Sequence, residues 1–203
     1  KDEDTVVIPA VFGLKDQAVI EKIRETIGHK TIFAPTMPPS VPGIRSQMKL
    51  RSEFENAGGR FFLGDTVVSA KYDEEGKVDS ISTVNFGDII VHADHFVLAT
   101  GSFFSKGLIA TPQKVYVPIF GIDVTYQEKR GEWFNTDFWK KQNYISFGAK
   151  VNSDLNVSID GKTVSNLYAI GSLIGGSNAL YEGSGGGTAI ISAMAAADKI
   201  LEN

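Results

Sequence analysis

The sequence predicts an α/β fold, and three observations carry that prediction. Short β-rich runs with a period of two fill residues 60–101. Apolar residues at helical spacing occur at both ends of the chain, over 15–27, 44–57 and 188–201. Seven of the 21 glycines lie in residues 171–187, between an apolar strand and the last helix. Strands, helices and a glycine-rich turn in this order are typical of a ligand-binding α/β domain.

Composition narrows the classes of protein that fit. The chain has 203 residues, 42% hydrophobic and 22% charged, which suits one large globular domain or two small ones. The net charge of −4 argues against a general nucleic-acid binder. Because the chain has no cysteine, it can form no disulfide, thiolate zinc site or iron–sulfur centre of its own. No apolar run reaches the about 18 residues that favour a membrane span.

The first 57 residues predict a strand and two helices. Thr5–Phe12 is apolar and β-branched, and Lys15–Ile27 has helical spacing that Gly28 ends. Four of the seven prolines lie in Phe33–Pro42, which predicts an extended loop. A second amphipathic helix is expected over Ile44–Ala57. Its inward residues are expected to be Ile44, Met48, Phe54 and Ala57.

The middle of the chain predicts a β-meander of three or four strands. Turn signals at residues 73–76 and 86–88 separate its strands. The last strand, His95–Thr100, is nearly all apolar and runs into Gly101. A buried strand that ends in Thr-Gly-Ser favours a functional sheet edge, although an ordinary strand-to-loop turn has the same sequence.

Residues 102–203 predict an aromatic-rich region followed by a second strand, loop and helix. Both tryptophans fall in 102–150, where the aromatic cluster indicates core packing or contact with a partner protein. Residues 151–165 are typical of a hairpin, and Leu167–Ile170 of a short buried strand. The glycine segment 171–187 then leads into a helix over Thr188–Leu201.

A strand, a glycine-rich loop and a helix N-terminus together suit a phosphate, a pyrophosphate or an electron-rich ring edge. The alternative is a mobile surface loop, but apolar residues interrupt the glycines. No Lys follows them as a P-loop requires, and Gly183–Thr188 only approaches the dinucleotide fingerprint. The candidate cofactor-binding residues are Thr100, Gly101, Ser102, Gly171, Ser172, Gly175, Gly176, Gly183, Gly185, Gly186, Gly187 and Thr188.

These motifs resemble the two-dinucleotide-binding-domain flavoproteins, in which a meander precedes an ATG strand and a late strand ends at the flavin. Within them the chain resembles the B subunits of bacterial anaerobic glycerol-3-phosphate dehydrogenases. Four stretches carry this likeness: MPPSVPGIR at 37–45, GSFFSKGL at 101–108, RGEWF with DFW at 130–139, and AIGSLIGG with GSGGG at 169–187. The opening GxGxxG of that family is absent, and the chain does not begin with Met, so we expect the C-terminal half of such a protein.

The resemblance implies an FAD/NAD(P)-binding-like flavoprotein fold with four segments. Residues 1–57 would end a substrate or cap region, 58–101 hold the meander and ATG strand, 102–150 form an inserted substrate or cap region, and 151–203 bind the flavin. It also implies oxidation of sn-glycerol 3-phosphate to dihydroxyacetone phosphate, with the flavin accepting hydride. The cofactor would be FMN, with FAD as the alternative.

The resemblance further implies two partners, a catalytic A subunit and an iron–sulfur C subunit, with electron transfer to a quinone. Such a complex would lie in the cytoplasm at the inner face of the plasma membrane, held there by the partners. The phosphate dianion of the substrate needs cations, and Arg45, Lys106 and Arg130 are the candidates, although each can also be a solvated charge.

The sequence identifies no general base and predicts no metal site. His92 and His95 flank Ala93-Asp94, but a strand places them on opposite faces, and His29 follows a helix-ending glycine. The shortage of bases leaves two alternatives open. One is a non-catalytic electron-transfer or scaffolding member of the same complex, and the other is a different flavin oxidoreductase of the same superfamily.

Overall fold

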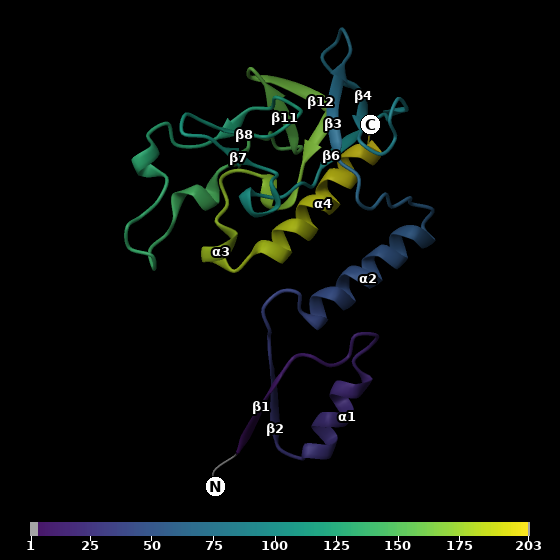
Figure 1. The fold of residues 1–203 in the computed structure, drawn as a ribbon, viewed down its shortest axis with the longest axis vertical. Coiled ribbons are helices and arrows are strands. Elements are labelled where there is room, and N and C mark those ends of the chain that lie inside the picture. The colour runs from purple at the N-terminus through teal and green to yellow at the C-terminus, as the bar shows by residue number, and fades with distance from the viewer. Residues whose placement is uncertain (1–3, 203) are drawn as a thin grey trace. The chain divides into compact units, whose positions relative to one another are not determined.

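The computed structural model describes residues 4–202 and divides into two compact units, up to Gly64 and from Asp65 onward. Figure 1 shows the elements of both units. In the first unit, β1 (Thr5–Pro9) and β2 (Lys30–Ala34) pair in parallel. The helix α1 (Ala18–Ile27) connects them. It ends where Gly28 takes φ +66° and its N–H donates to Arg24 O at 3.2 Å, as the sequence predicts.

The proline-rich segment is shorter than the predicted loop. Its first residues belong to β2, and α2 (Val41–Asn56) already begins before its end. Pro42 is tolerated in the first turn because the amide hydrogen it lacks has no intrahelical acceptor there. Ser40 caps the helix, with its Oγ accepting from Gly43 N at 3.2 Å. The prediction of an extended loop over the whole of 33–42 was therefore wrong at both ends.

The predicted inward face of α2 is also wrong. Met48 is 54% exposed, Phe54 is 48% exposed, and no residue of α2 is buried. Within the described part of the first unit only Ala10 is buried. A two-stranded sheet offers too little apolar surface to cover two helices, so periodicity alone does not bury their faces in this unit.

The second unit contains two three-stranded sheets. The first is antiparallel, in the order β3 (Val67–Tyr72), β4 (Val78–Thr83) and β5 (Ile90–His92). The second has the order β11-β12-β6. In it β11 (Asn156–Ile159) and β12 (Lys162–Ala169) form the expected hairpin.

The strand β6 (Phe96–Leu98) is shorter than predicted and pairs in parallel with β12, outside the antiparallel sheet. Its side chains alternate, because Phe96 and Leu98 are buried while Val97 is 42% exposed. Asn166 of β12 links the two sheets, since its Nδ2 donates to Val78 O at 2.8 Å.

Residues 102–150 fold into short elements rather than a layer of their own. Two small antiparallel pairs form, β7 with β8 and β9 with β10. The elements are η1 (Phe103–Ser105), β7 (Ile109–Ala110), β8 (Val115–Tyr116), β9 (Val124–Thr125), η2 (Arg130–Glu132), η3 (Asn143–Ser146) and β10 (Gly148–Ala149).

Part of the aromatic cluster belongs to the core. The rings of Tyr126, Trp133 and Phe147 contact one another edge-on, with centroids 5.5–6.3 Å apart. Trp133 Nε1 donates to Gln127 O at 2.6 Å, so its polar atom is satisfied although the side chain is buried. This packing anchors the middle of the region to β10.

The C-terminal segment begins with η4 (Gly171–Leu173) and α3 (Ala179–Glu182) and ends with α4 (Gly185–Glu202). The last helix starts three residues before the predicted Thr188. Gly185, Gly186 and Gly187 therefore form its first turn instead of a loop, which corrects the sequence-based boundary. Glycine's low helix propensity hides such a start from a reading of propensity.

Candidate functional site

Two parallel strand ends define the candidate site. Because β6 and β12 run in parallel, the segments after Leu98 and Ala169 leave the sheet at the same edge. Ile170 N donates to Leu98 O at 3.1 Å and continues the pairing. Both strands then turn at glycines with positive φ, Gly101 at +75° and Gly171 at +64°. The structure thus brings two of the predicted cofactor segments together.

A hydrogen-bonded turn follows β6. Ser102 O accepts from Gly107 N at 3.0 Å, and Ser105 Oγ donates to Thr100 O at 2.8 Å. A Cβ at Gly107 would collide with the Thr100 carbonyl, so glycine is required at that position. Lys106 takes φ +63° at the end of η1, a conformation that a side chain disfavours. The turn is therefore tight and partly strained.

The last helix is fastened to the end of β12. Gly171 N donates to Ser192 Oγ at 2.8 Å, and Ser192 Oγ donates to Thr188 O at 2.6 Å. A Cβ on Gly171 would lie 3.8 Å from Ala189 Cα, so the helix packs closely on this turn. In Figure 1, α4 runs beside β6 and β12. The predicted residue Thr188 therefore lies in the helix turn held against Gly171.

Several glycines of the segment have roles within the fold. Gly175 N donates to Ala149 O at 3.0 Å, and Gly176 N donates to Ser146 O at 2.8 Å. Gly183 ends α3 with φ +66°. A Cβ at Gly175 would stand 2.9 Å from Gly148 O, too close for any other residue. Backbone packing accounts for these three glycines without a ligand.

The first turn of α4 is different. A Cβ on Gly186 or Gly187 would meet no atom within 4 Å, and neither residue has a positive φ. Gly185 has only ordinary contact, with Ala179 Cβ at 3.6 Å. Nothing in the described fold requires glycine at Gly186 or Gly187, and both residues are exposed. They leave the backbone of a helix N-terminus open to a ligand.

The three predicted cations do not form one cluster. Arg45 belongs to the first unit, where its Nη1 donates to Gly13 O at 2.6 Å. Arg130 Nη1 donates to Thr111 O at 3.1 Å, and its guanidinium lies 4.1 Å from the Trp133 ring centroid. Both guanidinium groups therefore have contacts within their own unit. Of the three, only Lys106 borders a cavity at the strand ends.

That cavity has a volume of about 560 Å³ and an apolar lining. Lys106 is the one titratable residue among those that line it. Neither a carboxylate nor an imidazole lies on its wall, so the described residues around it supply a cation and hydroxyls but no base. Its lining residues are Thr66, Val67, Ile81, Phe96, Val97, Leu98, Thr100, Ser105, Lys106, Gly107, Val117, Pro118, Ile119 and Phe120.

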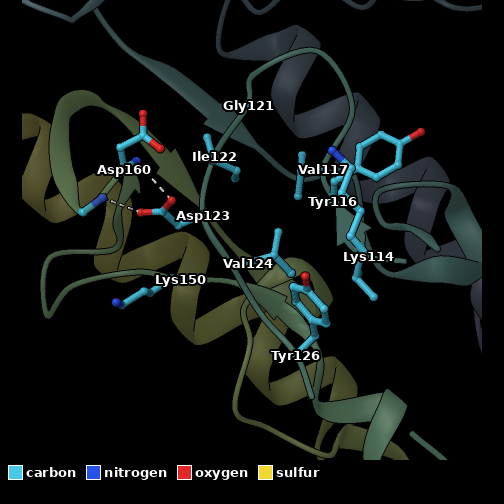
Figure 2. A pocket seen from close by; sticks show the side chains of 12 residues that line it. Lys114, Tyr116, Val117, Gly121, Ile122, Asp123, Val124, Tyr126, Lys150 and Asp160 are labelled. Atoms are coloured by element: carbon cyan, nitrogen blue, oxygen red, sulfur yellow. Dashed lines mark hydrogen bonds between the residues drawn. The ribbon is translucent and has the colours of Figure 1, made fainter. Parts of the chain in front are cut away.

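A second cavity of about 650 Å³, shown in Figure 2, contains charged residues that sequence reasoning did not select. Asp123 accepts from Ser158 Oγ at 2.7 Å and from Gly161 N at 2.9 Å. The Ser158 hydrogen bond, followed by the Gly161 amide, lowers the pKa of Asp123. Figure 2 shows Lys150 directed away from Lys114. These charges do not converge, and Asp123 serves to hold a turn.

The histidines lie apart from the strand ends. His92 Nδ1 is 3.2 Å from Asp79 O, and His95 Nδ1 is buried without a hydrogen-bond partner among the described residues. Between residues 4 and 202 the structure contains no group of three or more His, Cys, Asp or Glu side chains suited to a metal ion. None of the helices described there is long and apolar enough to cross a membrane.

Comparison with known proteins gives several matches over nearly the whole chain. The B subunits of anaerobic glycerol-3-phosphate dehydrogenase from Vibrio vulnificus strain CMCP6 and Haemophilus influenzae strain PittEE are 39% and 40% identical. Their counterpart from Pectobacterium atrosepticum is 36% identical. Each match covers 98% of this chain but only 46–47% of the relative. The chain therefore spans about half the length of these relatives.

The resemblance inferred from the motifs is confirmed by these matches. Residues 1–188 also match the family described as FAD binding domain. This match supports a flavin as the cofactor and agrees with the mixed α/β architecture and the glycine-rich strand ends. Because it covers most of the sequence, the chain belongs to the FAD binding domain family.

Proposed function

We propose that this chain forms one wall of a flavin site in an oxidoreductase that converts sn-glycerol 3-phosphate to dihydroxyacetone phosphate. The family match and the names of the relatives support the reaction class. One structural observation carries the proposal, namely the open first turn of α4 beside the ends of β6 and β12.

The open turn fits a flavin better than it fits a purely structural role. In a helix, glycine costs up to about 1 kcal/mol relative to alanine. Gly186 and Gly187 carry that cost without relieving a clash or a strained φ. Close approach of a ligand to the backbone explains them, and the positive end of the helix favours an anionic or electron-rich group. The phosphate of a flavin or the edge of its ring has that character.

The chain's own residues would bind and orient. Thr100, Gly101 and Ser102 would contact the cofactor from one strand end, and Gly171 and Ser172 from the other. A bound flavin would supply the capacity to accept two electrons from a secondary alcohol. Lys106 is the best of the three candidate cations for the substrate phosphate because it borders the adjoining cavity. We assign no general base within this chain.

The electron acceptor and the partners also belong to the proposal. The relatives are named as one lettered component of a dehydrogenase, which supports a complex with further components. Because this chain has no cysteine, iron–sulfur centres would belong to a partner such as the C subunit. The A subunit would be the recognised dehydrogenase. Electrons would pass through these partners to a quinone at the inner face of the membrane.

A second candidate function is electron transfer or scaffolding without substrate chemistry. The cavity at the strand ends favours it, because its described lining contains neither a carboxylate nor an imidazole that could take the alcohol proton. A flavin would still bind in this case. Only the reaction with glycerol 3-phosphate would be missing from this protein.

The visible absorption spectrum of the purified full-length protein separates these functions. We expect a bound flavin, which release and chromatography would identify as FAD or FMN. Anaerobic glycerol 3-phosphate should bleach the flavin bands if the protein is catalytic. A flavin that stays oxidised supports the second candidate, and a flavin reduced only by another substrate supports a different oxidoreductase. Absence of any flavin would overturn the proposed site.

A matched pair of variants locates the cofactor. The double variant Gly186→Ala/Gly187→Ala should lose flavin, because two methyl groups would occupy the approach to the helix start. Gly131→Ala is the control, since Gly131 also has open space and no positive φ but lies in η2. Equal flavin content in both variants would show that the first turn of α4 does not contact the cofactor.

A further inference from the structure

One loop of the second unit presents large aromatic side chains to solvent. In residues 134–142, here called the aromatic loop, Phe138 is 79% exposed and Trp139 is 88% exposed. Their ring centroids are 5.3 Å apart in an edge-on contact. Trp133, only six residues before Trp139, is 6% exposed and belongs to the core. Figure 1 shows this stretch, between teal and green, projecting from the body of the second unit.

The aromatic loop is held in a defined conformation. Gln142 Oε1 accepts from Asn135 N at 2.8 Å, and Gln142 Nε2 donates to Asp137 O at 3.0 Å and to Lys140 O at 3.1 Å. Asp137 Oδ1 accepts from Trp139 N at 3.1 Å. Polar side chains thus fix the backbone while both rings stay exposed. Such exposure is unfavourable in water, so the ordered loop indicates a contact surface.

The chemistry of the tip favours a lipid surface over a protein. Tryptophan is enriched at membrane–water interfaces, where its ring lies among the headgroups. Lys140 and Lys141 directly follow the aromatic pair and can pair with anionic headgroups while their stems lie along the apolar layer. A narrow tip with two aromatic side chains is small beside the about 800 Å² that each partner buries in a stable protein interface.

We propose that the tip of the aromatic loop, Phe138 to Lys141, inserts its two rings into the interface of a bilayer that contains anionic lipid. This contact would come from the chain itself, independently of partner proteins and of the proposed flavin chemistry. It is an interfacial contact of side chains, which differs from a membrane-spanning helix. The charges around the tip limit its strength, because Lys140 Nζ is 4.0 Å from the Asp137 carboxylate.

Sedimentation of the full-length protein with vesicles tests the proposal. We expect binding to phosphatidylcholine vesicles that contain phosphatidylglycerol, and weaker binding to phosphatidylcholine alone. Phe138→Ala/Trp139→Ala should lower the partition coefficient at least about tenfold, because two aromatic burials are lost. Lys140→Gln/Lys141→Gln should lower it by about fivefold for each lysine, and only on anionic vesicles. Phe104→Ala is the matched control, because Phe104 is 81% exposed but lies in η1.

Tryptophan fluorescence places the ring directly. Brominated lipids should quench the Trp139 emission, and Trp139→Phe should keep vesicle binding while losing that quenching component. Equal melting temperatures of the variants would exclude misfolding, as expected for exposed side chains. Vesicle binding that is absent, or unchanged in Phe138→Ala/Trp139→Ala, would overturn the proposal. Loss of a partner protein from that variant without any change in vesicle binding would assign the tip to a protein interface instead.

Discussion

The glycines of residues 171–187 fall into two groups with different causes. In the turns after β12, Gly171, Gly176 and Gly183 have positive φ, and Gly175 packs on the backbone of Gly148. In the first turn of α4, the space around Gly186 and Gly187 is open and their φ is ordinary. The comparison teaches that glycine density combines two signals, one for chain folding and one for access to the backbone. Only the second signal points to a ligand.

Gly148→Ala should have the largest effect on the folding side of this comparison. Its Cβ would collide with Leu173 O and Gly175 N, which are backbone atoms that cannot rotate away. We expect a loss of about 3 kcal/mol in the free energy of unfolding, the upper part of the range for overpacked cores. Urea unfolding of the full-length protein measures it. Stability within error of the wild type would mean that β10 and the glycine segment are not packed this closely.

Ser192→Ala should weaken the attachment of α4 to β12. The buried Gly171 N–H would lose its acceptor, and we expect a cost of about 1–2 kcal/mol. Ser184→Ala is the control, because the Ser184 hydroxyl donates to an exposed carboxylate, that of Glu182, and should matter little. Thermal unfolding of both variants gives the comparison. Equal melting temperatures would show that the hydroxyl of Ser192 is not a structural acceptor.

Gly187→Ala should separate the two signals within one residue. Because the site is open and helical, we expect the free energy of unfolding without flavin to rise by up to about 1 kcal/mol. Flavin affinity should fall by roughly tenfold, equivalent to about 1.4 kcal/mol. Unfolding of the flavin-free protein and a flavin titration measure the two changes. A stability gain with unchanged affinity would remove the ligand-based explanation for this glycine.

The smallest expected effect is on pH dependence at Asp123, away from both glycine groups. Its pKa is lowered first by the Ser158 hydroxyl and then by the Gly161 amide. The carboxylate therefore stabilises the fold fully above the ordinary aspartate pKa of about 3.9, and this stabilisation is lost as pH falls toward the lowered value. Asp123→Asn should flatten stability against pH only in this acidic range, which acid titration of stability would measure. An unchanged acid limb would exclude the contribution of this carboxylate.

The sequence predicted the parts of the fold that depend on local signals. Gly28 ends α1, and the hairpin of β11 and β12 turns at Asp160-Gly161, because both depend on a glycine within a few residues of the element. The strand ends that form the candidate site were also selected in advance, on apolar runs followed by glycine. Their pairing in one sheet is consistent with that selection.

The missed features depend on contacts between distant segments. The acceptor role of Asp123 needs Ser158 from another hairpin, and no motif joins the two residues. The exposure of Met48 and Phe54 follows from how little surface the first unit offers, which helical periodicity does not report. The start of α4 was placed too late because propensity penalises a helix that begins with three glycines.

The parallel pairing of β6 with β12 has a consequence for synthesis of the protein. Phe96 pairs with Leu167 across a long stretch of intervening chain, so this edge of the sheet cannot close while the ribosome is still making the region between them. The turn at Gly171 further waits for Ser192, which is made later still. A cofactor held at this edge would therefore be acquired after translation of this segment, and an incomplete chain would remain empty.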